Sequence, residues 1–296
     1  MLPNLIIIGA MRSGTTSLHF YLDQHPEIAM SRTKELNFFV ESKVWPCSWH
    51  KGADWYARQF DHDAPVRGEA SPTYSSFPWF DGAPARMHAL IPETKIIYLL
   101  RDPIERMISD FRLFENWGVW DFELADAMAD LEGNGLAHRS RYFMQLEKYL
   151  EYFPAEQIHI ATLEDLISNK RQTLREMFRF LGVDENFDTP QFDTVLNEAP
   201  VSAPPRTRLG RKLRKIWIIA VMYRVPVSVA EKWLKFGSRS SKKTTSQKNT
   251  PRKNTPKAAK PPRPSDEMLQ PLREYLREDI DKLRQFCGRD FKEWKL

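Results

Sequence analysis

The chain has 296 residues, of which 42% are hydrophobic and 12% aromatic, a composition typical of a soluble globular protein of one or two domains. Its formal charge of +5 has a local origin, because residues 238–264 contain nine of the 44 Lys and Arg residues and none of the 39 Asp and Glu residues. The remainder is mildly acidic, which excludes the extended basic surface of a dedicated nucleic-acid-binding protein.

The N-terminal segment predicts a buried strand rather than a targeting signal. Its apolar run, Leu5–Ile8, follows no basic residue and is too short for a signal peptide or a membrane span. The two cysteines, Cys47 and Cys287, are too few for a disulfide framework and favour a reducing compartment. We therefore expect a cytoplasmic protein, for which peripheral contact with a membrane stays open.

Short apolar runs alternate with helical patterns along the first 182 residues. Strands are predicted at 4–9, 27–31, 65–71, 95–101 and 157–162, and helices at 16–25, 103–114, 141–154 and 170–182. Continuous apolar strands that alternate with helices favour a parallel sheet covered on both faces. We therefore expect an α/β fold of the P-loop NTPase type, with three layers and a central, mainly parallel sheet of about five strands.

The chain is expected to divide into a core at 1–205, a basic helical and low-complexity insertion at 206–264, and a C-terminal helix and tail at 265–296. Residues 238–264 cannot bury enough apolar surface to order themselves, which predicts a mobile excursion. A helix from about Asp266 should return to the core through apolar residues spaced three or four apart: Leu269, Leu272, Leu276, Ile280 and Leu283.

The sequence "GAMRSGTT", from Gly9 to Thr16, lies between the first strand and the first helix. A glycine-rich turn in this position presents backbone N–H groups that bind phosphate oxygens. Further donors are the hydroxyl groups of Ser13, Thr15, Thr16 and Ser17. The structural alternative is a turn that only caps the helix.

The loop lacks one part of a nucleoside-triphosphate site. Thr15 stands where a P-loop has its lysine, and the cation of the loop is Arg12 instead. The strand at 95–101 ends in Arg101, where a triphosphatase needs an acidic metal ligand. A cation there suits a second phosphate, so the pattern indicates a nucleotide with phosphates at two places. A P-loop kinase or NTPase is the alternative, and no metal site is predicted.

Together the two motifs resemble those of the sulfotransferases that use 3′-phosphoadenosine 5′-phosphosulfate (PAPS), especially the heparan-sulfate-type and bacterial enzymes. The second motif, "RDPIERMIS", places Ser109 eight residues after Arg101. The segments "KELNFF" and "GEASPTY" are also similar, whereas residues 206–264 depart from those enzymes. The resemblance implies that Arg101 and Ser109 bind the 3′-phosphate. It also implies that the loop binds the 5′-phosphosulfate through Arg12, Ser13, Gly14, Thr15, Thr16 and Ser17, with PAP as the product.

The resemblance also implies the catalytic residues. Glu35, with two residues between it and the Phe38–Phe39 pair, stands where these enzymes have their general base. Arg12 would stabilise the leaving group, and Lys34 would either hold Glu35 ionised or touch the sulfuryl group. The flanking aromatic rings are expected to desolvate Glu35 partly. The structural alternative is that Glu35 is a solvated partner of Lys34.

The acceptor is less determined. Glu69 and Tyr74 are candidate substrate residues, although Ala70 stands where the heparan enzymes often have a lysine. A glycan, a lipid or a small metabolite could supply the hydroxyl or amine. A membrane-surface protein that uses residues 209–264 is a rival interpretation. By the resemblance, Phe291 and Trp294 should pack against the nucleotide end of the core.

Overall fold

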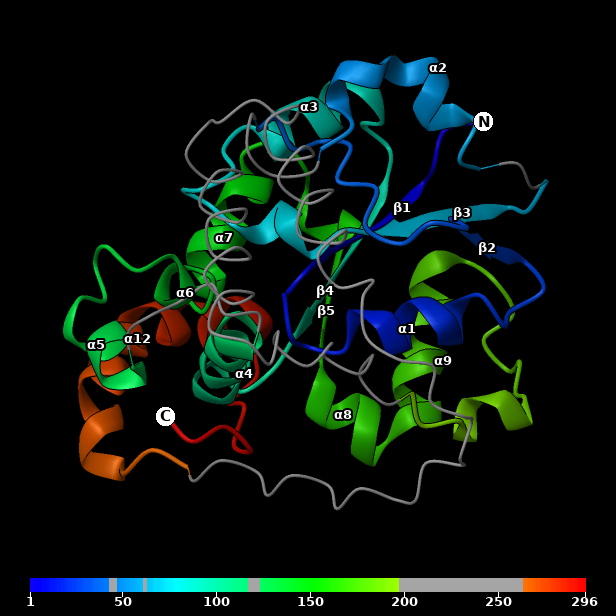
Figure 1. Ribbon diagram of the computed structural model, residues 1–296. Coiled ribbons are helices and arrows are strands. Elements are labelled where there is room, and N and C mark those ends of the chain that lie inside the picture. The colour runs from blue at the N-terminus through cyan, green and yellow to red at the C-terminus, as the bar shows by residue number, and fades with distance from the viewer. Residues whose placement is uncertain (43–46, 61–62, 117–122, 197–262) are drawn as a thin grey trace, which may run out of the picture.

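A computed structural model describes residues 1–42, 47–60, 63–116, 123–196 and 263–296 (Figure 1). The predicted insertion at 206–264, including its expected mobility, lies outside the described residues except for 263 and 264. The three-part division of the chain therefore stays a prediction.

The described chain contains one sheet of five parallel strands in the order β2-β3-β1-β4-β5. The strands are β1 (Leu5–Gly9), β2 (Ile28–Met30), β3 (Val66–Ala70), β4 (Lys95–Leu100) and β5 (Ile158–Thr162). Ile6 of the central strand pairs with Glu69 on one side and with Ile96 on the other. The predicted α/β fold is confirmed.

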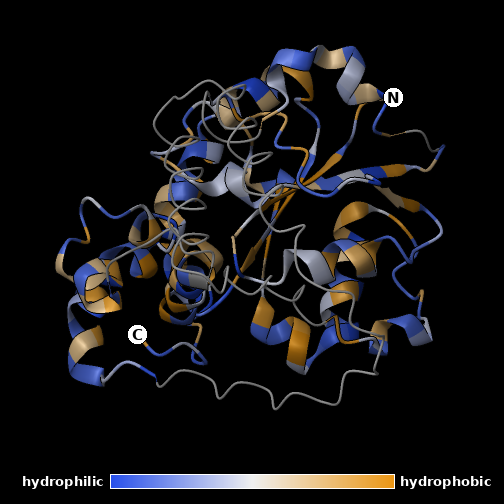
Figure 2. Ribbon diagram, in the orientation of Figure 1, coloured by the Kyte–Doolittle hydropathy of each residue, from blue (hydrophilic) through white to orange (hydrophobic). Residues whose placement is uncertain are grey.

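The side chains of β1 alternate between two apolar clusters because a strand has a period of two residues. Leu5 and Ile7 face the cluster covered by α1 (Thr15–Leu22), α8 (Leu163–Ser168) and α9 (Lys170–Leu181). Ile6 and Ile8 face the other cluster, which is covered by α3 (Ala83–Leu90), α4 (Pro103–Asn116), α7 (Tyr142–Leu150) and α12 (Asp266–Cys287). Figure 2 accordingly shows apolar strands between helices that carry both apolar and polar residues.

Shorter elements fill the connections between these layers. They are the helices α2 (Gly52–Ala57), α5 (Leu124–Ala129) and α6 (Gly135–His138), and the 3-10 turns η1 (Trp49–Lys51), η2 (Pro72–Ser75), η3 (Ala155–Gln157) and η4 (Pro190–Asp193). No helix in the described ranges has both the length and the apolar character needed to cross a membrane.

Helix α12 packs on α7, α5 and α4, and the five apolar residues predicted for its inner face are all fully buried. Its Asp279 lies at the start of α7, where the carboxylate accepts hydrogen bonds from the amides of Phe143 and Met144, both 2.9 Å. These are two of the N–H groups that a helix leaves without internal partners at its N-terminus. One acidic residue therefore joins α12 to α7.

The C-terminal tail follows α12 and packs against the ends of β4 and β5. Phe291 stacks on Trp294 with 4.2 Å between ring centroids, and Trp294 contacts Tyr142 at 5.8 Å. The backbone amide of Lys295 donates a 2.8 Å hydrogen bond to Asp102, the residue after Arg101. The tail thus lies at the end of the sheet where the predicted nucleotide residues lie.

Candidate functional site

The glycine-rich loop begins where the chain leaves β1. The register against β4 shifts between Ile7 and Gly9, and the amide of Ala10 donates to the carbonyl of Leu99 at 2.6 Å. Gly9 has a φ of 151°, and a Cβ there would lie 2.0 Å from the hydroxyl oxygen of Ser75. Only glycine leaves room for Ser75 at this distance, so Gly9 allows the start of the loop to lie directly against η2.

The loop has the features of an anion site. Arg12 and Gly14 both have left-handed backbones, with φ of 71° and 87°, and Gly14 precedes the first turn of α1. The hydroxyl of Ser13 is buried and has no hydrogen-bond partner within the described chain. A buried donor without a partner and the free N–H groups of a helix N-terminus both fit a bound phosphate or sulfate. Of the other predicted loop residues, Thr15 is buried, Thr16 is exposed and Ser17 is half-buried.

The two predicted nucleotide motifs meet beside this loop. Arg12 Nε donates a 3.0 Å hydrogen bond to Ser109 Oγ, which lies on the second turn of α4. Arg101 Nη1 donates to the backbone carbonyl of Arg12 at 3.2 Å. Arg12 is therefore in direct contact with Ser109, 97 positions away, and with Arg101, 89 positions away.

Asp102 stands near the position where a P-loop triphosphatase has an acidic metal ligand, but here it accepts hydrogen bonds from backbone amides. One of its oxygens accepts from the amides of Ile104 and Glu105, at 2.9 and 3.0 Å, which caps α4. The other oxygen accepts from Lys295 in the tail. Its lone pairs are directed at backbone N–H groups, so Asp102 fixes the start of α4 directly after Arg101.

A buried ionic cluster under the loop was missed by the sequence analysis. Asp110 is fully buried and pairs with Arg106 at 2.8 Å and with Arg139 at 3.2 Å. Arg139 Nη1 also contacts the sulfur of Met11 at 3.2 Å, next to Arg12. Burial lowers the pKa of Arg139, and the carboxylate of Asp110 opposes that effect. Arg106 belongs to the "RDPIERMIS" motif, but nothing in the sequence marks Arg139.

Lys34 and Glu35 follow β2 and form an ion pair of 2.7 Å, with 20% and 48% of their side chains exposed. The amide of Glu35 donates to the carbonyl of Ala70, at the end of β3, with a 3.0 Å hydrogen bond. Phe38 and Phe39 are fully buried in the core, and the Glu35 side chain keeps about half of its surface exposed, so any desolvation is only partial. Glu35 therefore remains accessible to an acceptor.

Glu69 and Tyr74, the candidate substrate residues, are both buried. The Glu69 carboxylate accepts hydrogen bonds from Tyr56 at 2.7 Å, Tyr74 at 2.6 Å and Ser71 at 2.7 Å. Burial raises the pKa of Glu69, although the three hydroxyl donors oppose the shift. Since neither side chain has appreciable exposed surface, direct contact with an acceptor is not supported in this structure.

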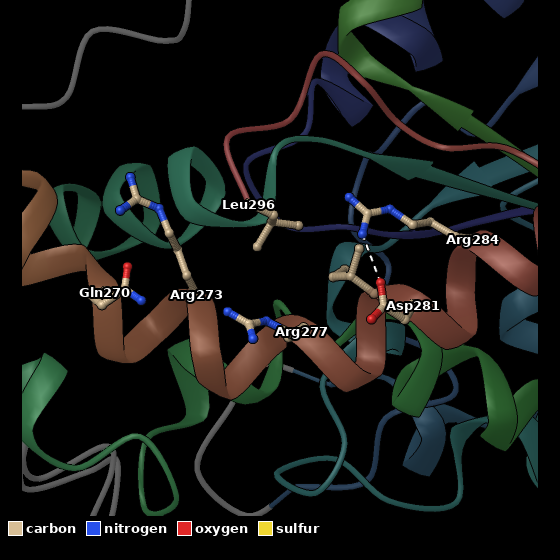
Figure 3. Close-up of a pocket in the computed structure, with 7 residues that line it drawn as sticks. Gln270, Arg273, Arg277, Asp281, Arg284 and Leu296 are labelled. Atoms are coloured by element: carbon tan, nitrogen blue, oxygen red, sulfur yellow. Dashed lines mark hydrogen bonds and ion pairs between the residues drawn. The ribbon is translucent and has the colours of Figure 1, made fainter.

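A pocket of about 280 Å³ lies along α12, on the side where Leu296 of the tail approaches the helix (Figure 3). It is lined by Gln270, Arg273, Arg277, Ile280, Asp281, Arg284 and Leu296. Arg273 donates to the carbonyl of Lys295 at 3.2 Å, and Arg284 pairs with Asp281 at 2.8 Å. None of the predicted site residues lines this pocket, and two of its arginines bind the helix and tail themselves.

The fold and the site together define an α/β protein with a glycine-rich loop after its first strand, with Arg12 in the loop and Arg101 in contact with it. Comparison with known proteins gives the family. The model of the sulfotransferase domain matches residues 2–199, and the chain belongs to this family. The predicted resemblance is confirmed.

Named relatives agree with this assignment. The membrane-associated sulfotransferase kil1 of Dictyostelium discoideum is 26% identical over 275 residues, covering 62% of this chain and 56% of the relative. The bifunctional heparan sulfate N-deacetylase/N-sulfotransferase 2 of Homo sapiens is 29% identical over 204 residues, covering 62% and 22%. The chain thus spans about a fifth of the length of one relative and just over half of the length of the other. The crystal structure of a sulfotransferase from Alicyclobacillus acidocaldarius, 21% identical, matches with a TM-score of 0.67 over 100% of both chains and shows the same fold.

The comparison also corrects the expected location. A cytoplasmic enzyme was predicted from two cysteines and a short apolar run, but the relative kil1 is by its name membrane-associated. Cysteine count and the first residues of a chain do not determine where a sulfotransferase acts. The cytoplasmic prediction is therefore wrong for this kind of protein.

Proposed function

We propose that the protein transfers a sulfuryl group from PAPS to a hydroxyl or amine of an acceptor and releases PAP. The observation that carries this proposal is the contact of Arg12 with Ser109 and of Arg101 with the Arg12 backbone. It brings together the loop suited to a 5′-phosphosulfate and the two residues suited to a 3′-phosphate. The proposed ligands in the loop are Arg12, Ser13, Gly14, Thr15, Thr16 and Ser17.

In the proposed reaction, the acceptor oxygen or nitrogen attacks sulfur in line. The bond between sulfur and the bridging phosphate oxygen breaks, and PAP leaves. Glu35 takes the acceptor proton, and Arg12 stabilises the negative charge that develops on the bridging oxygen. Lys34, 2.7 Å from the Glu35 carboxylate, orients that group before the acceptor arrives.

A glycan is the acceptor class that we propose to test first. Relatives from Mus musculus and Homo sapiens are named heparan sulfate glucosamine 3-O-sulfotransferase 5, and each is 29% identical to this chain over 194 residues. Desulfated heparan sulfate is therefore a suitable first probe, followed by lipid and small hydroxylated acceptors.

Thermal unfolding with nucleotides tests the proposal. PAP should raise the melting temperature without Mg²⁺, and ATP should do so much less. Arg101→Ala should weaken PAP binding by about 10- to 100-fold, because a charge-assisted hydrogen bond is lost, but should change binding of adenosine 5′-phosphosulfate little. Arg175→Ala, on an exposed position of α9, is the charge-matched control. Tight ATP binding that needs Mg²⁺, with no effect of PAP, would instead support the kinase interpretation.

A further inference from the structure

We propose that residues 69–74, "EASPTY", act as a template that fixes the backbone of residues 35–39, with Glu69 and Tyr74 as positioning residues. This inference rests on the proposed function, because it explains how the proposed base Glu35 is held. The sequence marks both segments, "KELNFF" and "GEASPTY", but the reaction described above uses only the first.

The backbone of residues 35–39 has a shape that needs contacts from outside the segment. Glu35 and Asn37 both have left-handed backbones, with φ of 62° and 48°, although neither is glycine. Each such conformation is unfavourable for an L-residue and persists only where surrounding contacts impose it. Two of them within three residues mean that the segment does not hold this shape by itself.

The template supplies hydrogen-bond acceptors for three amides among residues 35–38. The acceptors are the carbonyl of Ala70 for Glu35 (3.0 Å), the hydroxyl of Ser71 for Asn37 (3.0 Å) and the hydroxyl of Tyr74 for Phe38 (2.9 Å). In addition, Thr73 donates to the Asn37 side chain at 2.6 Å.

Glu69 determines the direction of the two hydroxyl groups. Tyr74 and Ser71 each have one hydroxyl hydrogen, and both donate it to the Glu69 carboxylate, at 2.6 and 2.7 Å. Their oxygen lone pairs are then free to accept from the amides of residues 37 and 38. Both Glu69 oxygens act as acceptors here, Oε1 from Tyr74 and Oε2 from Ser71, which keeps both hydroxyls in this orientation, whereas an amide in place of the carboxyl would also donate.

The same template reaches the nucleotide loop. The amide of Ser71 donates to the carbonyl of Ile7 at 3.1 Å, and Ser75, one residue after the template, lies against Gly9. One rigid segment thus contacts both the Glu35 backbone and the strand that leads to Arg12. It sets the position of the proposed base relative to the proposed nucleotide ligands.

The test compares two buried tyrosines that donate to the same oxygen of Glu69. Tyr74→Phe removes a bond to Glu69 and also the acceptor of the Phe38 amide. Tyr56→Phe removes a 2.7 Å bond to the same carboxylate, and no amide of residues 35–39 is among the hydrogen-bond partners of Tyr56 in the described chain. The two variants should lose similar thermal stability.

Amide hydrogen exchange of the full-length protein without ligand is the first readout. Tyr74→Phe should speed exchange in residues 37–39 by about tenfold, and Tyr56→Phe should leave it unchanged. The second readout is turnover of PAPS with desulfated heparan sulfate. Tyr74→Phe should lower kcat by about 10- to 100-fold, because misplacement of a reacting group by about 1 Å has this effect, while PAP affinity stays normal.

Equal exchange and equal turnover in the two variants would overturn the template. If Tyr74→Phe does not fold, Ser71→Ala removes the acceptor of the Asn37 amide with a smaller change of volume, and its exchange decides the same question. Absence of PAP binding in the unmodified protein would overturn the proposed function instead. The exchange comparison would still decide whether residues 69–74 hold the segment.

Discussion

At the scale of single residues, the site depends on backbone conformations that its side chains do not favour. Arg12 and Glu35 have φ of 71° and 62°, in a region where a non-glycine residue costs about 1–2 kcal/mol. Both residues carry a charge that the proposed reaction uses. Strain of this kind is typical of functional sites, where the surrounding structure imposes a geometry that the local sequence would not adopt.

Replacing the proposed base tests the most specific role in the site. Glu35→Gln keeps the size of the side chain but cannot accept a proton, so kcat should fall by about 10²- to 10⁴-fold with PAP affinity unchanged. Glu41→Gln, which changes an exposed carboxylate six positions along the chain, is the control. Turnover and PAP binding are measured with labelled PAPS and by calorimetry. Near-normal turnover of Glu35→Gln would exclude this residue as the base.

The contacts of Arg12, Arg101 and Ser109 could be anticipated because each residue belongs to a motif with fixed spacing next to a strong strand. Arg139 could not, because its contact with Met11 joins residues 128 positions apart and depends on the packing of α6. The burial of Glu69 was also not visible in the sequence. A carboxylate at a strand end normally faces solvent, and only the three hydroxyl donors of the folded chain make its burial possible.

At the scale of elements, α12 is joined to α7 by a buried carboxylate as well as by apolar packing. Asp279 is 4% exposed and accepts from two amides at the start of α7. Burial raises its pKa from 3.8 to about 6, against the opposing effect of those two hydrogen bonds. The folded protein therefore binds this proton more tightly than the unfolded chain does.

The raised pKa of Asp279 makes the free energy of unfolding depend on pH. Between pH 4 and 6 the unfolded chain is ionised at this position while the folded protein is still protonated, so stability falls as pH rises. A shift of about two pKa units corresponds to roughly 3 kcal/mol. The free energy of unfolding of the unmodified protein should therefore decline by about that amount relative to Asp279→Asn between pH 4 and 7. Urea unfolding across this range measures the difference.

Asp281→Asn, two residues further along α12, is the matched control because its carboxylate is 51% exposed. Its stability should run parallel to that of the unmodified protein over the same pH range. Parallel curves for Asp279→Asn as well would show that the buried carboxylate does not titrate as proposed.

The strands and long helices were predicted because their apolar patterns are continuous or periodic over several residues. All five strands and the helix Asp266–Cys287 occur where the patterns predicted them. Helices α2 and α6, with six and four residues, are too short to show a period, and tertiary contacts determine them. The hydrogen bond from the tail to Asp102 is donated by the backbone amide of Lys295, so no residue type in the sequence could predict it.

At the scale of the whole molecule, the charge is divided between a mildly acidic body and one basic segment. Eight of the nine cations of residues 238–264 lie outside the described chain, and the ninth, Arg263, pairs with Glu105 on the first turn of α4 at 3.2 Å. The described end of the basic segment therefore lies close to the start of α4, which follows Asp102.

Neutralising the segment tests whether it attracts an anionic acceptor. Replacing the eight Lys and Arg residues of 238–262 by Gln keeps the length and should raise the KM for desulfated heparan sulfate by about tenfold at low salt. The salt dependence of KM should flatten, and PAP affinity should stay unchanged. An exchange of Lys and Arg for one another at these positions is the control. Loss of PAP affinity would instead show that the segment closes over the nucleotide.

The bond between the Lys295 amide and Asp102 has a thermodynamic consequence. Asp102 fixes the first turn of α4, and the residue before it is the one proposed to bind the 3′-phosphate. If the nucleotide binds Arg101 as proposed and favours the same conformation of residues 101 and 102 as the docked tail, each would strengthen the binding of the other by an equal factor. Protection of the Lys295 amide from hydrogen exchange would then increase when PAP is added, although the bond to Asp102 uses only the backbone of that residue.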